Sequence, residues 1–177
     1  MNEYLILTVI ADDRPGLVDT LSRTIAEHDG SWLESRMSRL AGKFAGVLRI
    51  EVASERSDAL EAALRALSAE GFQLQLERSP DPAAIEAPRE RILEVVGHDR
   101  PGIIAALSRT LAVHRVNVES LETERKNAAM SGESLFQAKA RIHMPADLDE
   151  NELQRALEAI AGDLMVDLRM GAETKTA

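Results

Sequence analysis

Asp13-Arg14-Pro15-Gly16 is followed closely by Leu21-Ser22-Arg23-Thr24, and both stretches occur a second time in the chain. The first recurs as Asp99-Arg100-Pro101-Gly102 and the second as Leu107-Ser108-Arg109-Thr110. Each recurrence lies 86 residues later (99 − 13 and 107 − 21). Ungapped identities at one fixed offset are the signature of an internal duplication. The sequence therefore predicts two copies of one module.

The segments around these motifs follow the same order in both copies. Short runs rich in Leu, Ile and Val, or alternating apolar and polar residues, indicate strands. Leucines at spacings of three and four indicate helices, and Gly71 is a typical stop for the helix before it. Strands are expected at 4–11, 32–40, 47–52 and 73–78, then at 91–97, 117–124, 135–144 and 165–170; helices are expected at 16–28, from 57 or 58 to 70, at 102–114 and at 149–161.

A βαββαβ order predicts the α+β class and a ferredoxin-like module, a four-stranded antiparallel sheet with two helices on one face. The predicted division is a first module at 1–79, a linker at 80–89, a second module at 90–171 and a tail at 172–177. The linker assignment rests on the three prolines Pro80, Pro82 and Pro88, which do not suit a regular element.

Composition narrows the range of functions. The 177 residues carry a formal net charge of −9, and an acidic surface disfavours direct binding of nucleic acid. The chain has no cysteine, which excludes disulfides and thiolate chemistry. The apolar run at residues 5–11 is too short to span a membrane and lacks the pattern of a signal peptide. A cytoplasmic protein without a membrane association is expected.

The repeated loop between strand and helix is the most informative place for chemistry. A proline suits a first helical turn, and a glycine lets a ligand or another chain approach the backbone closely. Free N–H groups at a helix start attract a carboxylate. Asp13 and Asp99 then have two alternatives, to cap the helix or to face a ligand ammonium group. The same loop also fits a plain helix-starting turn with no ligand.

The loop sequence, followed by Leu17 or Ile103 in a βαββαβ module, resembles that of the ACT domain. The resemblance covers both repeats, and the segment from Val116 to Leu121 matches it as well. In that family the first strand–helix loop and the start of the second strand bind amino acids, often between two modules. By position, the resemblance implies ligand-binding roles for Asp12, Asp13, Arg14, Pro15, Gly16, Leu17 and Ser31, and for His98, Asp99, Arg100, Pro101, Gly102, Ile103 and Asn117. Many members have Asn where this chain has Ser31.

The resemblance implies a regulator rather than an enzyme. Its effector would be a small amino acid, it would need no cofactor, and it would assemble as a homo-oligomer. Because the chain shows no element for reading DNA, control of transcription would act through a separate DNA-binding transcription factor.

Other functions remain as alternatives. The first is a protein–protein interaction module without a metabolite. RNA binding is a second, since ferredoxin-like sheets also serve as RNA platforms, but the five aromatic residues form no paired set on one strand. A small hydrolase is a third, and no Ser-His-Asp arrangement supports it. His143 has no histidine, Asp or Glu at metal-ligand spacing along its strand, so no metal site is expected.

Overall fold

The computed structural model describes residues 1–79, 89–127 and 134–172, which form two compact units divided near residue 84. The first unit contains, in chain order, strand β1 (Asn2–Asp12), helix α1 (Leu17–Glu27), strands β2 (Ser31–Leu40) and β3 (Lys43–Ala53), helix α2 (Ser54–Ala66), the short 3-10 helix η1 (Leu67–Glu70) and strand β4 (Gln73–Ser79). The second contains β5 (Arg89–His98), α3 (Ile103–Val113), β6 (Asn117–Asn127), β7 (Ser134–Met144), α4 (Glu150–Leu164) and β8 (Val166–Gly171).

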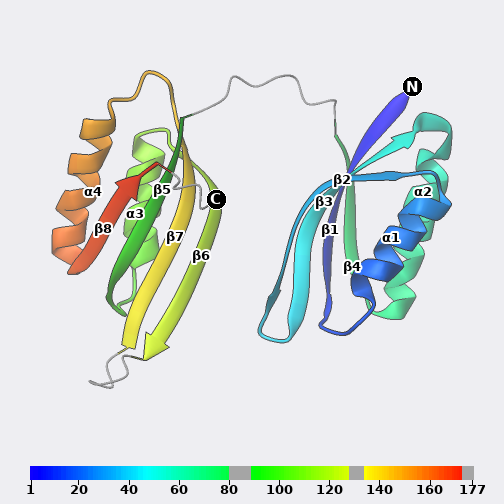
Figure 1. The fold of residues 1–177 in the computed structure, drawn as a ribbon, viewed down its shortest axis with the longest axis horizontal. Coiled ribbons are helices and arrows are strands. Elements are labelled where there is room, and N and C mark those ends of the chain that lie inside the picture. Colours follow the sequence, from blue (N-terminus) through cyan, green and yellow to red (C-terminus); the bar gives the residue numbers. More distant parts are fainter. Residues whose placement is uncertain (80–88, 128–133, 173–177) are drawn as a thin grey trace. The chain divides into compact units, whose positions relative to one another are not determined.

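Each unit is one antiparallel sheet with two helices on one face (Figure 1). The strand orders are β2-β3-β1-β4 and β6-β7-β5-β8, so the predicted ferredoxin-like fold is confirmed in both copies. Side chains alternate along the strands, and the helices cover one side of each sheet. The opposite side, here called the open face, carries Ile6, Thr8 and Ile10 of β1 and Glu90, Ile92 and Glu94 of β5.

Each unit has its own hydrophobic core between sheet and helices. Leu5, Leu7 and Val9 of β1 pack in the first core against Leu21 and Ile25 of α1. In the second core, Leu93 and Val95 of β5 take the place of Leu7 and Val9, at the offset of 86. Trp32 is partly buried and packs against the first core.

Several boundaries differ from the sequence prediction. Helix α2 begins at Ser54 rather than at 57 or 58, and both the amide and the hydroxyl of Ser54 donate to the carbonyl of Met1. β5 begins at Arg89, which belonged to the predicted linker. The other residues of that linker and nearly all of the predicted tail lie outside the described residues. Gly71 ends η1 in the left-handed region at φ 89°, as its sequence position indicates.

Arg91 of β5 and Glu150 in the first turn of α4 tie sheet to helix in the second unit. The guanidinium donates from Nη2 to Oε2 at 2.6 Å and from Nε to Oε1 at 2.7 Å. These bonds lower the pKa of the Glu150 carboxyl below its ordinary value and raise the pKa of Arg91. The pair therefore contributes stability at a pH above the carboxyl pKa of the unfolded chain, and this stability is lost as the pH falls through the lower folded pKa.

We expect Glu150→Gln to remove part of the acid sensitivity of the second unit. Urea unfolding of the wild type should show a midpoint that declines as the pH is lowered from 6 to 3, and the variant should decline less. Glu158→Gln, on the exposed side of the same helix, is the matched control and should decline like the wild type. Equal declines in the wild type and the Glu150 variant would contradict this role.

Candidate functional site

The repeated loop lies at one end of each unit, where β1 passes into α1 and β5 into α3. Its backbone is anchored to the neighbouring hairpin, because the amide of Asp13 donates to the carbonyl of Gly42 at 2.9 Å. The amide of Asp99 donates equivalently to the carbonyl of Ser134 at 3.0 Å. Asp12 to Gly16 and His98 to Gly102 are exposed, whereas Leu17 and Ile103 enter the cores. Each loop is therefore exposed to solvent, while its backbone is held to the neighbouring strands by a hydrogen bond.

The glycines, and not the prolines, stand at the helix starts. Gly16 and Gly102 are the N-cap residues, with φ values of 91° and 96°. A residue with a side chain rarely adopts this left-handed backbone, so glycine is required for its conformation. Among the residues that the structure describes, nothing lies within 4 Å of a Cβ atom built at either position, so the space beside each glycine is open to them. Pro15 lies just before the N-cap, outside both the predicted helix at 16–28 and the observed one.

The aspartates do not cap the helices. No side chain among the described residues forms a cap hydrogen bond at either helix start, although the carbonyls of Gly16 and Gly102 accept the first helical bonds at 2.9 Å. The first-turn amides therefore keep the partial positive charge of a helix start without a side-chain acceptor. Of the two alternatives for Asp13 and Asp99, capping is excluded.

Each aspartate forms an ion pair with an arginine that the sequence analysis missed. Arg39 of β2 contacts Asp13, with 2.6 Å between Nε and Oδ2, and Arg125 of β6 contacts Asp99 at 2.9 Å between the same atom types. The arginines are again 86 residues apart (125 − 39), so the repeat offset alone could have identified them as an equivalent pair. Both copies therefore hold one cationic and one anionic side chain beside a helix start.

The loop arginines point toward the second helix of their unit. Arg14 donates from Nη2 to the carbonyl of Glu70 at 2.7 Å and lies 6.0 Å from the ring centre of Phe72. Arg100 contacts the sulfur of Met165 at 3.8 Å. These contacts hold each loop against the C-terminal end of the helical segment that follows the third strand of its unit. The guanidinium of Arg14 is hydrogen-bonded to the backbone there.

The two loops differ in charge. Asp12 forms an ion pair with Lys43 that lowers the pKa of its carboxyl, and the equivalent residue in the second copy is His98. The first turn of α1 contains Asp19, whereas the first turn of α3 has no acidic residue. Because a nearby carboxylate repels an anion, the second loop is the better place for a ligand carboxylate.

Ser31 and Asn117 lie at the other end of the sheet from the loop of their own unit. Ser31 pairs with Glu51 of β3, whereas Asp12 pairs with Lys43, eight residues away along that strand (51 − 43). Asn117 pairs with His143 and His98 with Leu135, again eight residues apart (143 − 135). Eight strand residues span roughly 27 Å. One small ligand cannot contact both groups within one unit.

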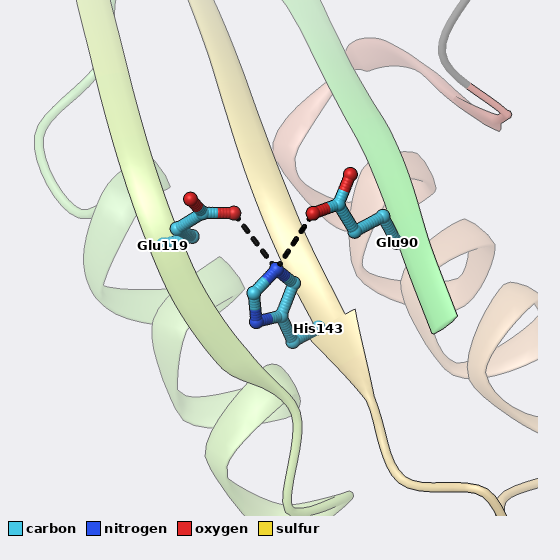
Figure 2. A group of neighbouring side chains, drawn as sticks. All are labelled: Glu90, Glu119 and His143. Atoms are coloured by element: carbon cyan, nitrogen blue, oxygen red, sulfur yellow. Dashed lines mark hydrogen bonds and ion pairs between the residues drawn. The ribbon is translucent and has the colours of Figure 1, made fainter. Parts of the chain in front are cut away.

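The histidines have distinct environments. His28 and His114 end helices α1 and α3, where Nδ1 donates to the carbonyls of Thr24 at 2.9 Å and Thr110 at 2.8 Å. His143 has no acidic residue at metal-ligand spacing along its own strand, but Glu90 and Glu119 approach it from the two neighbouring strands (Figure 2). Sequence spacing cannot reveal this cluster, since its members come from three strands.

Two further structural facts bear on function. A hollow of about 510 Å³ lies on the open face of the second sheet, lined among others by Glu94, Glu122 and Lys139 and not by the loop. No helix in the described part of the chain is long and apolar enough to cross a membrane.

Comparisons with known proteins agree with this fold. Family models of the ACT domain match residues 3–77 and residues 91–162. The glycine cleavage system transcriptional repressor of Escherichia coli (strain K12) is 22% identical over 162 residues, which cover 91% of this chain and 85% of that protein.

Two solved structures resemble the whole chain. The crystal structure of an unknown protein from Galdieria sulphuraria has a TM-score of 0.83 and 28% identity, covering 98% of this chain and all of that one. A structure provisionally described as a glycine cleavage system transcriptional repressor has a TM-score of 0.74 and 17% identity, with 97% of each chain covered. The two matched halves account for most of the chain, which belongs to the ACT domain family with one ACT domain in each unit.

Proposed function

We propose that this chain is a non-enzymatic regulator that binds a small amino acid, such as glycine, at the repeated loop and controls transcription through a DNA-binding partner protein. Membership of the ACT family and the likeness to the E. coli repressor support a regulatory, amino-acid-binding role. The observation that carries the proposal is the helix start without a side-chain cap, flanked by an Asp–Arg pair, in both copies.

A free amino acid carries one negative and one positive charge, and the loop offers a partner for each. The α-carboxylate would accept hydrogen bonds from the first-turn amides and from Arg39 or Arg125, while the ammonium group would face Asp13 or Asp99. Hydrogen bonds that involve a charged group are the stronger ones in proteins. Binding would exchange the Asp–Arg contact for contacts of both side chains with the ligand.

The site proposed here is the loop of a single unit. Ser31 and Asn117 are not part of it, because they lie at the far end of their own sheet from the loop.

Calorimetric titration of the full chain with glycine, serine and other amino acids tests the function. We expect saturable binding in the wild type, and at least tenfold weaker binding in Arg125→Gln, since a tenfold loss corresponds to about 1.4 kcal/mol and a charge-assisted hydrogen bond contributes at least that much. Arg109→Gln, on an exposed position of α3, is the control and should bind like the wild type. Absence of heat and of any shift in melting temperature with every amino acid would refute the proposal.

A second candidate is a protein–protein interaction module without a metabolite. Its supporting observation is the apolar part of the first open face, where Ile10 and Val47 are 41% and 45% exposed on neighbouring strands. Sedimentation with and without the amino acid separates the two functions. An assembly that responds to no amino acid would favour this candidate over the sensor.

A further inference from the structure

Glu90, Glu119 and His143 form a compact cluster on the open face of the second sheet (Figure 2). Nε2 of His143 lies 2.7 Å from Oε2 of Glu119 and 3.2 Å from Oε1 of Glu90. The three ligand atoms all lie within 4.8 Å of one another. Two carboxylates and one imidazole nitrogen therefore converge on one point.

The sheet positions these side chains. Glu90 of β5 is the register partner of His143 of β7, so the two side chains stand side by side on one face. Between Val118 and Ser120 the pairing of β6 with β7 shifts by one residue, and Glu119 is the extra residue of this bulge. A bulge redirects a side chain that regular alternation would place elsewhere. Figure 2 shows the Glu119 carboxylate directed at His143.

The electrostatics of the cluster favour a cation between its members. Two carboxylate oxygens approach one nitrogen, which carries at most one proton and can direct it along one of the two contacts. The Oε2 atom of Glu119 is shielded from solvent, so water screens its negative charge poorly. Arg141 approaches the other oxygen of Glu90, with 3.6 Å between Nη1 and Oε2, and leaves Oε1 toward His143.

We propose that Glu90, Glu119 and His143 bind a divalent transition metal of the Zn²⁺ class, through Nε2 and one oxygen of each carboxylate. One nitrogen and two oxygens suit Zn²⁺ and its neighbours, whereas Mg²⁺ and Ca²⁺ prefer oxygen ligands alone. Tetrahedral Zn²⁺ with ligands at about 2.0 Å separates its ligand atoms by roughly 3.3 Å. The two separations from Nε2 of His143, 2.7 and 3.2 Å, are close to that value, and the two carboxylate oxygens lie within 4.8 Å of one another. Water would fill the fourth position.

The first unit supplies an internal comparison, because it has the same backbone with different side chains. Tyr4 pairs with Glu51 as Glu90 pairs with His143, and the bulge of β2 places Leu33 where Glu119 stands. This set has one carboxylate, no imidazole and an apolar residue at the bulge. The proposal therefore predicts one metal ion per chain, in the second unit.

The metal site is separate from the loop site. It lies beside Asn117, at the end of the second sheet opposite the His98–Ile103 loop, and does not depend on the proposed function. A failure of amino-acid binding would leave it untouched, and a failure of metal binding would leave the loop site untouched.

Calorimetric titration of the untagged full chain with ZnCl₂, after removal of metals by a chelator, tests the proposal. We expect one Zn²⁺ per chain, a higher melting temperature with Zn²⁺, and at least tenfold weaker binding in both His143→Gln and Glu119→Gln. The controls are His114→Gln, at a histidine outside the cluster, and Glu122→Gln, at an exposed glutamate of the same strand β6. Both controls should bind Zn²⁺ like the wild type.

Nitrogen-15 spectra of the histidine side chains provide a readout that does not depend on any variant. Zn²⁺ should shift the Nε2 resonance of His143 and leave those of His28 and His114 in place. Equal Zn²⁺ affinity in the cluster variants and the controls, no binding by the wild type, or an unshifted His143 resonance would overturn the proposal.

Discussion

Leu7→Ala should lower the free energy of unfolding of the first unit by about 2–5 kcal/mol and leave the second unit folded. Leu7 is fully buried in β1, between its register partners Leu48 of β3 and Leu76 of β4. Truncation removes apolar contacts and leaves a cavity that the sheet cannot close. A domain of about 80 residues has only roughly 4–12 kcal/mol of stability, so this loss is a large part of it.

Because each unit has its own core, a core substitution should destabilise only the unit that carries it. Because Leu7 and Leu93 belong to different clusters, Leu93→Ala should affect the second unit alone. Hydrogen exchange read by mass spectrometry should show lost protection only in the unit that carries the substitution. Leu40→Ala, at a leucine that is 78% exposed, is the matched control and should stay within about 0.5 kcal/mol of the wild type. Protection lost in both units at once would show that they fold as one cooperative body.

The fold could be predicted from sequence because its signals are local and occur twice. Helical spacing, strand alternation and Gly71 each depend on residues close together in the chain. The offset of 86 carried the assignments of the first strand, the first helix and the second strand into the other copy. The errors lie where tertiary contacts determine the boundary. Helix α2 begins early because Ser54 bonds to the carbonyl of Met1, a contact that sequence periodicity does not contain.

The candidate site was predicted less completely for a related reason. The loop motif identified both helix starts, but the ion pairs of Asp13 with Arg39 and of Asp99 with Arg125 depend on the strand that lies beside the loop. Ser31 and Asn117 were grouped with the loop by resemblance, and the register separates them from it by the length of a sheet. The cluster at His143 depends on the registers of two strand pairs and on a bulge in β6, and sequence spacing predicts none of these.

Gly102→Ala should abolish or strongly weaken amino-acid binding at the second loop, in a protein that remains folded. At φ 96° an alanine costs about 1–2 kcal/mol, and the chain relieves this strain by rotating the peptide groups at the start of α3. The first-turn amides then point away from the position that the ligand carboxylate needs. A loss of about 1.4 kcal/mol in this interaction weakens binding tenfold, so a tenfold or larger rise in Kd is expected.

The same substitution at another glycine separates loss of the loop geometry from the general effect of an added methyl group. Gly162 lies in α4 without a positive φ, and in the described part of the chain a Cβ atom there meets nothing within 4 Å. Gly162→Ala should therefore keep wild-type affinity and gain some helix stability, since alanine is the better helix former by about 1 kcal/mol. Circular dichroism confirms that both variants are folded before calorimetry compares them. If Gly102→Ala binds amino acids as tightly as Gly162→Ala does, the backbone of the second loop is not the binding element, because its geometry would then have changed without any effect on the ligand.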